Sequence, residues 1–260
     1  MKIVYLGIDL LHPVLCSLLQ ERCEVMKIFT CRTDNITEFN TDVTATAAAY
    51  GIPLTLNRIT RQDLQELREA GCELLVCAGY YYRVPVLDGL PMVNVHPSPL
   101  PLGRGAWPMP LIIKKGLSSG GVTMHKMTEE FDCGDILLRE SFPIRENETL
   151  QTYMEQVFQF VPSMVHSLVT DLPELLMTAV PQGEGEYWPN PVEEDWTVTP
   201  DMNVEEADRI LRAFYGYECI YKTSRERVEL IGGRARKGNP QGHVFPVRGG
   251  YIYAERIRML

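Results

Sequence analysis

The sequence predicts an α/β protein with a doubly wound, mostly parallel sheet and a small C-terminal α+β subdomain. Short apolar runs that resemble buried strands alternate with helix-like segments over the first two thirds of the chain. This alternation is the pattern of successive βαβ units. A stretch rich in Gly, Pro and acidic residues follows, from Gln182 to Pro200, and predicts a linker before the C-terminal region.

The predicted strands are short apolar runs, and the one that ends at His96 is the most informative. Pro97 follows it and biases His96 toward extended backbone, so this strand should carry its last residues to the edge of the sheet. The predicted strands are Lys2–Ile8, Glu24–Cys31, Ile52–Leu56, Cys72–Tyr80, Met92–His96, Gly120–Met127 and Asp135–Ile144.

The segments between these strands predict helices. They are Leu11–Arg22, Thr44–Tyr50, Arg61–Ala70 and Leu150–Thr170. In the C-terminal region a helix is expected over residues 204–216, with Asn203 as its N-cap and Gly216 at its end. Short β-like pieces should follow around Val228, Val244 and Tyr251. The predicted domain boundaries are 1–182 for the large domain, 183–200 for the linker and 201–260 for the subdomain.

Composition is ordinary for a globular protein, with 45% hydrophobic and 23% charged residues in 260. The chain has a net charge of −9, yet residues 201–260 hold 11 Lys and Arg against 8 Asp and Glu. A basic cluster there could touch phosphates, but a solvated surface of mixed charge is the favoured interpretation. The overall acidity disfavours extended nucleic-acid binding. The cluster consists of Arg225, Arg227, Arg234, Arg236 and Lys237.

The sequence indicates a cytoplasmic protein. No apolar run reaches about 18 residues, so no membrane span is predicted. Asp9 and His12 interrupt the apolar N-terminus and no cleavage site follows, so a core strand is expected there rather than a signal peptide. The seven cysteines are odd in number and form no CxxC pair, which predicts reduced thiols. The five histidines are scattered, and no metal site is predicted.

Three polar residues, Asn94, His96 and Asp132, suit acyl transfer to an amine. A strand's period of two places Asn94 and His96 on one face, so both can act on one atom. Attack by a neutral amine builds negative charge on the acyl oxygen and positive charge on nitrogen. Asn94 could donate to the oxyanion. His96 could either donate to it as imidazolium or take the proton of the amine, and Asp132 could set the tautomer of His96 and raise its pKa. The structural alternatives are a core histidine and a turn aspartate.

The surrounding motifs are Asn94-Val95-His96, Ser98-Pro99-Leu100-Pro101, Arg104-Gly105, Gly121-Val122-Thr123 and Asp132-Cys133-Gly134. Together they resemble the folate-dependent formyltransferase family. That family includes methionyl-tRNA formyltransferase, glycinamide ribonucleotide transformylase and the amino-sugar N-formyltransferases. The resemblance covers residues 1 to about 180 and is weak in the tail. Pro99 replaces the usual first Leu of the turn motif.

The resemblance implies a mechanism and a formyl donor. Asn94, His96 and Asp132 would be catalytic, and 10-formyltetrahydrofolate would supply the formyl group. Relatives hold the pterin largely through main chain, in the loop after the third long strand and in the segment before the catalytic Asp. The matching positions in this sequence are Arg83, Val84, Pro85, Met127, Thr128 and Glu129. His125 could face the site, although a structural role is favoured.

The acceptor is expected to be a small primary amine on a nucleotide-linked sugar. The stretch Arg32–Val43 resembles the amino-sugar enzymes and holds one Arg against three acidic residues, which would repel a tRNA backbone. A methionyl-tRNA formyltransferase-like enzyme is the alternative, since the tail is mildly basic.

Two further hypotheses about the function stay open. A formyltetrahydrofolate hydrolase would use the same three residues, but such relatives carry an extra N-terminal domain. A non-catalytic binding module would be expected to lose one of the three. The residues of Tyr153–Met164 would allow a helix-mediated homodimer, which core packing explains equally well.

Overall fold

The computed structural model describes residues 1–32, 40–217, 219–238 and 242–260. The chain divides into two compact units. The first comprises residues 1–104, 121–141 and 157–187, and the second comprises residues 105–120, 142–156 and 188–260. The domain boundaries expected from composition, at residues 182 and 200, remain a proposal. The expected acceptor loop lies largely outside the described residues, because 33–39 are not among them.

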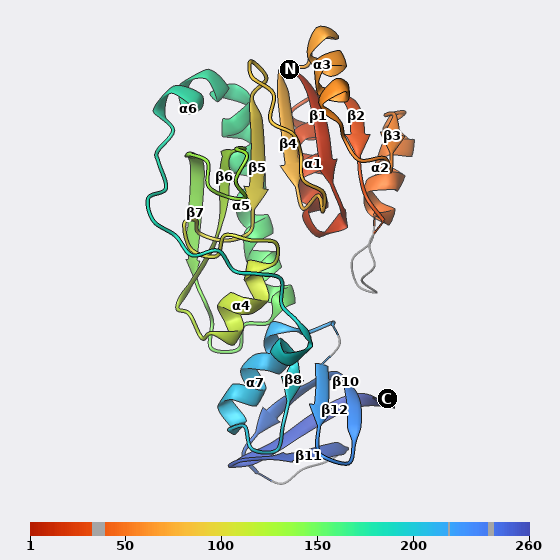
Figure 1. Ribbon diagram of the computed structural model, residues 1–260, viewed down its shortest axis with the longest axis vertical. Helices are drawn as coiled ribbons and strands as arrows, with labels where there is room; N and C mark the ends of the chain where they lie inside the picture. Colours follow the sequence, from red (N-terminus) through yellow and green to blue (C-terminus); the bar gives the residue numbers. More distant parts are fainter. Residues whose placement is uncertain (33–39, 218, 239–241) are drawn as a thin grey trace. The chain divides into compact units, whose positions relative to one another are not determined.

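The larger sheet has seven strands in the order β3-β2-β1-β4-β5-β6-β7 (Figure 1). Strands β3 to β5 of this order pair in parallel, and β6 runs antiparallel to β5. The chain order reverses between β1 and β4, so the sheet is doubly wound and the predicted α/β class is confirmed. The strands are β1 (Lys2–Gly7), β2 (Glu24–Phe29), β3 (Leu54–Thr55), β4 (Leu74–Ala78), β5 (Met92–His96), β6 (Ser119–Lys126) and β7 (Ile136–Pro143).

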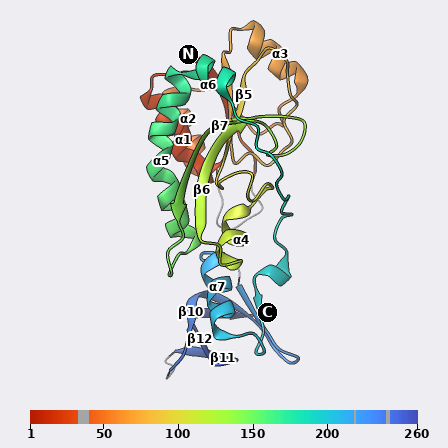
Figure 2. The same cartoon turned by 90° about the vertical axis from the view of Figure 1, so that its left-hand side faces the viewer.

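Helices cover both faces of this sheet, with α1 and α3 on opposite sides (Figure 2). Thr60 begins α3 through a capping box with Asp63, and Gly51 ends α2 in the left-handed region at φ +65°. The four predicted helices of this region are found with ends shifted by no more than three residues. The helices are α1 (His12–Gln20), preceded by the 3-10 turn η1 (Asp9–Leu11), α2 (Thr41–Tyr50), α3 (Arg61–Glu69), α5 (Leu150–Thr170) and α6 (Leu172–Thr178).

A buried apolar cluster fixes the carboxyl ends of the central strands. Leu6 of β1 and Cys77 of β4 belong to it, and Leu64 attaches α3. The cluster extends to Val84 in the loop after β4, with Met127 packed against it. Each fully buried side chain of this size stabilises the fold by about 1.5–3 kcal/mol. The loops beside the strand ends are therefore held by the same core that holds the sheet.

The second unit contains a five-stranded sheet in the order β11-β12-β10-β9-β8. Its helix α7 (Val204–Ala213) begins at Asn203, whose side chain accepts a 2.7 Å hydrogen bond from the Glu206 N–H, so the predicted N-cap is confirmed. The 3-10 turn η2 (Glu193–Asp195) and β8 lie within the expected linker. The strands are β8 (Thr197–Val198), β9 (Cys219–Lys222), β10 (Arg227–Arg236), β11 (His243–Val247) and β12 (Gly250–Met259).

The helix α4 (Pro108–Lys114) was not expected from the sequence. Its first six residues are all buried, so the segment is apolar all round and shows no helical period. The signal that could have found it is Pro108 at the first helical position.

The sequence also led to expectations about membrane spans, the cysteines and the apolar residues of α5. Among the described residues no helix is long and apolar enough to cross a bilayer. All seven cysteines are free thiols, five of them buried. In α5 the side chains of Tyr153, Val157, Val161 and Met164 are buried within the chain, so core packing accounts for these apolar positions.

Candidate active site

Strand β5 carries Asn94 and His96 to the carboxyl edge of the sheet. Its antiparallel partner β6 places His125 directly opposite Asn94 and Thr123 directly opposite His96. Residues opposite each other in a sheet project from the same face. The β5–β6 pair therefore presents Asn94, His96, Thr123 and His125 together, and adds His125 to the predicted pair.

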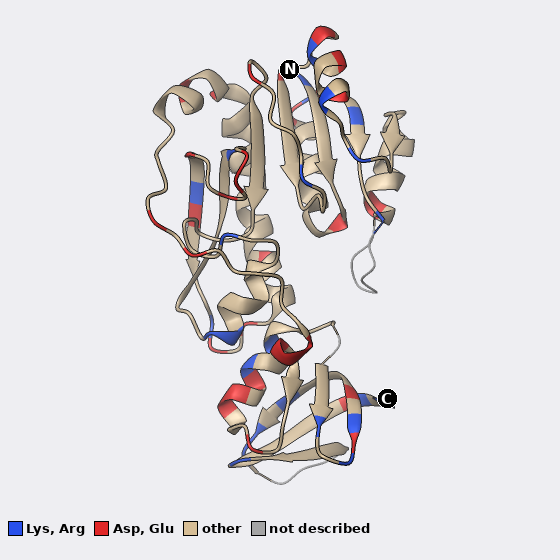
Figure 3. Cartoon of the chain, viewed as in Figure 1, with Lys and Arg blue, Asp and Glu red and all other residues tan. Residues whose placement is uncertain are grey.

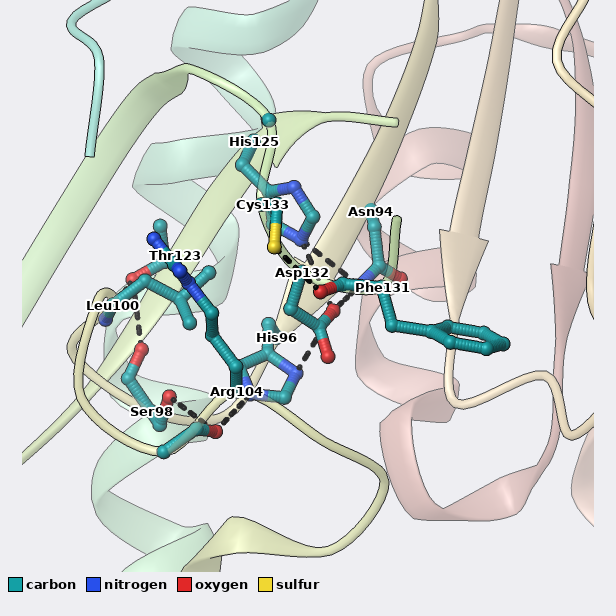
Figure 4. Close-up of polar contacts among 12 residues, drawn as sticks. Asn94, His96, Ser98, Leu100, Arg104, Thr123, His125, Phe131, Asp132 and Cys133 are labelled. Atoms are coloured by element: carbon teal, nitrogen blue, oxygen red, sulfur yellow. Dashed lines mark hydrogen bonds and ion pairs between the residues drawn. The ribbon is translucent and has the colours of Figure 1, made fainter. Parts of the chain in front are cut away.

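Asp132 joins this group from the turn between β6 and β7 (Figure 4). Its Oδ1 accepts a 3.1 Å hydrogen bond from Asn94 Nδ2 and lies 3.5 Å from His96 Nδ1 and 3.4 Å from His125 Nε2. The side chains of His96, His125 and Asp132 are only 6%, 2% and 10% exposed. Asn94, which is half-buried, and the largely buried side chains of His96 and Asp132 thus meet in one cluster, as the sequence predicts.

The tautomers of both histidines follow from backbone carbonyls, which can only accept. His96 Nε2 lies 2.8 Å from the Gly103 carbonyl oxygen, so it carries the proton and leaves Nδ1 as an acceptor in the neutral ring. His125 Nδ1 lies 2.8 Å from the Lys126 carbonyl oxygen, so its Nε2 is the acceptor. His96 Nδ1 and Asp132 Oδ1 are therefore two acceptors that face one another.

The amide of Asn94 is fully engaged in this arrangement. Its Nδ2 lies 3.1 Å from His125 Nε2 and 3.1 Å from Asp132 Oδ1, so both of its N–H donors have partners. The proximity of the Asp132 carboxylate assigns the amide orientation, because the amide oxygen would repel it. Donation from Asn94 to an oxyanion, as expected from the sequence, would need one of these bonds to be shared or exchanged.

Burial lowers the pKa of His96 below its ordinary value, because desolvation disfavours the imidazolium. The carboxylate of Asp132 and the Gly103 carbonyl partly oppose this shift in the pKa, whereas His125 adds to it. A neutral His96 is therefore favoured near pH 7, where it can take a proton at Nδ1.

Thr123 fixes the turn that follows His96. Its hydroxyl donates to the Ser98 carbonyl oxygen at 2.7 Å and accepts from the Leu100 N–H at 3.1 Å. Gly121 on the same strand allows this close approach, since an added Cβ would stand 2.8 Å from the Cβ of Pro99. The turn motif and the Gly-Val-Thr motif thus support one another, and the Pro99 departure is accommodated.

The two segments expected to hold the pterin lie side by side. Arg83 donates from Nη2 to the Glu129 carbonyl oxygen at 2.6 Å and also pairs with the Glu129 carboxylate. The Met127 N–H donates to the Met92 carbonyl oxygen, which holds this segment beside β5. Val84 turns its side chain into the core at 7% exposure, which leaves only its main chain available to a ligand. Thr128 donates from its hydroxyl to the Glu130 carbonyl oxygen at 2.8 Å, and Pro85 lies in the same loop as Arg83 and Val84.

Sequence reasoning missed two residues that touch this cluster. His125 was weighed and assigned a structural role, and the register of β5 with β6 is what brings it in. Gln182 was placed at the start of a linker, yet its Nε2 donates to the Asp132 carbonyl oxygen at 2.9 Å. The two residues are 50 positions apart in the chain, so no local sequence signal indicates this contact. In the described part of the chain, no group of three or more His, Cys, Asp or Glu residues is arranged to hold a metal ion.

Comparison with known proteins shows what this chain is similar to. A family model described as formyl transferase matches residues 1–169. The methionyl-tRNA formyltransferase of Treponema denticola is 28% identical over 186 residues, which are 69% of this chain and 57% of that protein. The chain thus spans little more than half the length of this curated relative.

Two solved structures share the fold. HypX from Aquifex aeolicus, solved in complex with tetrahydrofolic acid, superposes with a TM-score of 0.71 at 21% identity, covering 100% of this chain and 44% of that one. A 4-N formyltransferase from Francisella tularensis gives a TM-score of 0.71 at 18% identity, covering 88% of this chain and 96% of that one.

Proposed function

The chain belongs to the formyl transferase family, and on that premise we propose that it moves a formyl group from 10-formyltetrahydrofolate to a primary amine. The observation that carries the proposal is the facing pair of acceptors, His96 Nδ1 and Asp132 Oδ1, 3.5 Å apart in a buried cluster. The neutral His96 Nδ1 is a proton acceptor beside an anionic carboxylate, and an attacking amine supplies the N–H proton that such a pair can take. When bound, the folate supplies the formyl group.

In the proposed mechanism His96 acts as the general base. Its neutral Nδ1 takes the proton that the amine loses as its nitrogen forms a bond to the formyl carbon. Asp132 then stabilises the imidazolium electrostatically, while the Gly103 carbonyl keeps the ring oriented. The proton passes to the folate nitrogen as its bond to the formyl carbon breaks, so the products are a formamide and tetrahydrofolate. Asn94 is the candidate donor to the developing oxyanion.

The residues present fit the formyl donor. Arg83 and Glu129 bridge the two expected pterin segments, and the Met127 N–H bond attaches one of them to the strand that carries Asn94. Val84 and Met127 pack into a common core cluster, which leaves main chain as the polar surface of these segments. Main-chain donors and acceptors can match the amide-like edge of a pterin.

We propose a nucleotide-linked amino sugar as the acceptor. The chain is acidic, with a net charge of −9, and the expected acceptor stretch at 32–43 holds three acidic residues against one Arg. In the C-terminal basic cluster, three of five cations already pair with carboxylates, which removes much of a phosphate-binding footprint. These pairs are Arg227–Glu193, Arg234–Asp208 and Lys237–Glu205. Seven free thiols fit the reducing cytoplasm in which we expect the enzyme to work.

Initiator methionyl-tRNA is the second candidate acceptor, because curated relatives of this chain are named methionyl-tRNA formyltransferase. An absorbance assay that follows tetrahydrofolate release distinguishes these two acceptors from each other and from hydrolysis. The purified protein is mixed with 10-formyltetrahydrofolate alone, with nucleotide-linked amino sugars and with charged initiator tRNA. Turnover with an amino sugar supports the proposal, turnover with tRNA alone overturns the acceptor, and equal release without any amine indicates a hydrolase.

A further inference from the structure

Residues 180–187 form a strap across two loops of the site within the first unit. Val180 and Ile136 exchange hydrogen bonds of 2.8 and 2.9 Å in both directions, at the start of β7. Arg104 forms a bridge with Tyr187 at the other end of the strap, and its Nη2 donates to the Gly183 carbonyl oxygen at 2.9 Å. The strap therefore joins the loop that follows His96 to the start of β7.

The side chain of Gln182 lies between these attachments and binds the turn that holds Asp132. Its Nε2 donates to the carbonyl oxygens of Asp132 at 2.9 Å and Gly134 at 2.6 Å. Its Oε1 accepts from Arg104 Nε at 3.1 Å. The amide orientation is unambiguous, since Arg104 can only donate and the two carbonyls can only accept.

The Asp132 turn needs such support, because its backbone is unusual. Asp132 has φ +54°, in the left-handed region that non-glycine residues seldom adopt. On the other side of the turn Gly134 presses against β6, where an added Cβ would stand 1.9 Å from the Lys126 carbonyl oxygen. The turn is thus held between β6 and the Gln182 amide, with little freedom to shift.

We propose that Gln182 is a positioning residue that sets where the Asp132 carboxylate stands relative to His96. The proposal rests on the function proposed above, in which these two residues act as a pair. Asp132 Oδ1 contacts three side chains at 3.1–3.5 Å, so a small movement of the turn changes all three contacts. Displacements of about 1 Å can cost about 10²-fold in rate.

The test replaces Gln182 by Met, a neutral side chain of similar length that cannot donate or accept these bonds. We expect kcat to fall roughly tenfold or more, with KM for 10-formyltetrahydrofolate little changed. A histidine NMR titration should also show His96 titrating at lower pH than in the wild type. The titratable side chains that face it are Asp132 and His125, and a retreating Asp132 carboxylate no longer favours the imidazolium.

Two further variants keep the test decisive. Gln62→Met changes an exposed Gln of α3, whose Nε2 bonds Glu66, and should leave kcat and the His96 titration unchanged. Arg104→Lys keeps the charge but loses the forked contact with Gln182 and Gly183, so it should shift both readouts in the same direction by less.

An unchanged His96 titration in folded Gln182→Met and Arg104→Lys proteins overturns the positioning role. The titration needs no substrate, so its outcome is independent of the formyl acceptor. A wild type that is inactive with every amine would instead contradict the proposed function.

Discussion

His96 and Asp132 face one another through Nδ1 and Oδ1, which lie 3.5 Å apart. The opposite nitrogen of His96 is committed to the Gly103 carbonyl at 2.8 Å. The imidazole is thus fixed with its basic nitrogen toward the carboxylate, and protonation there turns two facing acceptors into an ion pair. Changes to either residue should therefore alter the activity.

Asp132→Asn should reduce formyl transfer by about 10²-fold or more, because the imidazolium formed in the reaction loses its anionic partner. Steady-state kcat with the identified acceptor measures this. Asp135→Asn is the matched control, since Asp135 lies three residues on and pairs with Lys126 at 41% side-chain exposure. Equal losses in both variants would argue against a specific role for Asp132.

The pH dependence should show a rising limb in kcat/KM below about pH 6.5, the ordinary pKa of histidine. Burial lowers the pKa of His96, and only its neutral form can accept a proton, so activity is lost as the pH falls through that pKa. Asp132 raises the pKa of His96, so Asp132→Asn should move the limb to lower pH. A movement to higher pH would be inconsistent with His96 as the base.

Asn94→Ala should lower turnover by roughly 10² to 10³, as loss of one oxyanion donor does elsewhere. The fold should persist, which circular dichroism and thermal unfolding can check, and donor binding measured by fluorescence should change little. Asn147→Ala, a substitution in the second unit, serves as the control. Wild-type turnover in Asn94→Ala would show that its amide only orders His125 and Asp132.

His96→Ala should remove formyl transfer and leave folate binding nearly intact, because the ring is placed to act on the amine. Equilibrium binding of tetrahydrofolate, followed by fluorescence, separates the two effects. A variant that folds but no longer binds folate would identify His96 as a structural residue of the donor site.

Asp208→Ala should destabilise the protein by about 3 kcal/mol or more, because Asp208 receives bonds from both Arg212 and Arg234. Burial opposes ionisation, yet the hydrogen bonds of these two arginines hold the pKa of Asp208 below its ordinary value. A carboxyl with a depressed folded pKa contributes stability above its unfolded pKa and loses it as the pH falls through the folded one. Urea unfolding at pH 7 and pH 3 should show the difference from wild type shrinking in acid, whereas Glu205→Ala on the same helix should change little.

The sequence by itself determined the fold class, most of the elements and three members of the site. Hydrophobic runs bounded by turn residues are local signals, so β5 and α5 were predicted with their observed ends. The spacing of Asn94 and His96 is likewise local, because a strand's period of two fixes their common face. Asp132 was singled out with them as the residue that could set the histidine tautomer, and its left-handed turn brings it to them.

Only the tertiary structure decided what surrounds those three residues. His125 enters through the register of β6 against β5, and Gln182 through a strap that returns to the site some 50 residues after Asp132. The helix α4 is buried all round, so packing rather than periodicity selects it. Such features depend on which distant segments meet, and a backbone hydrogen bond or a cross-strand pair leaves no trace in the local sequence pattern that could reveal its partner.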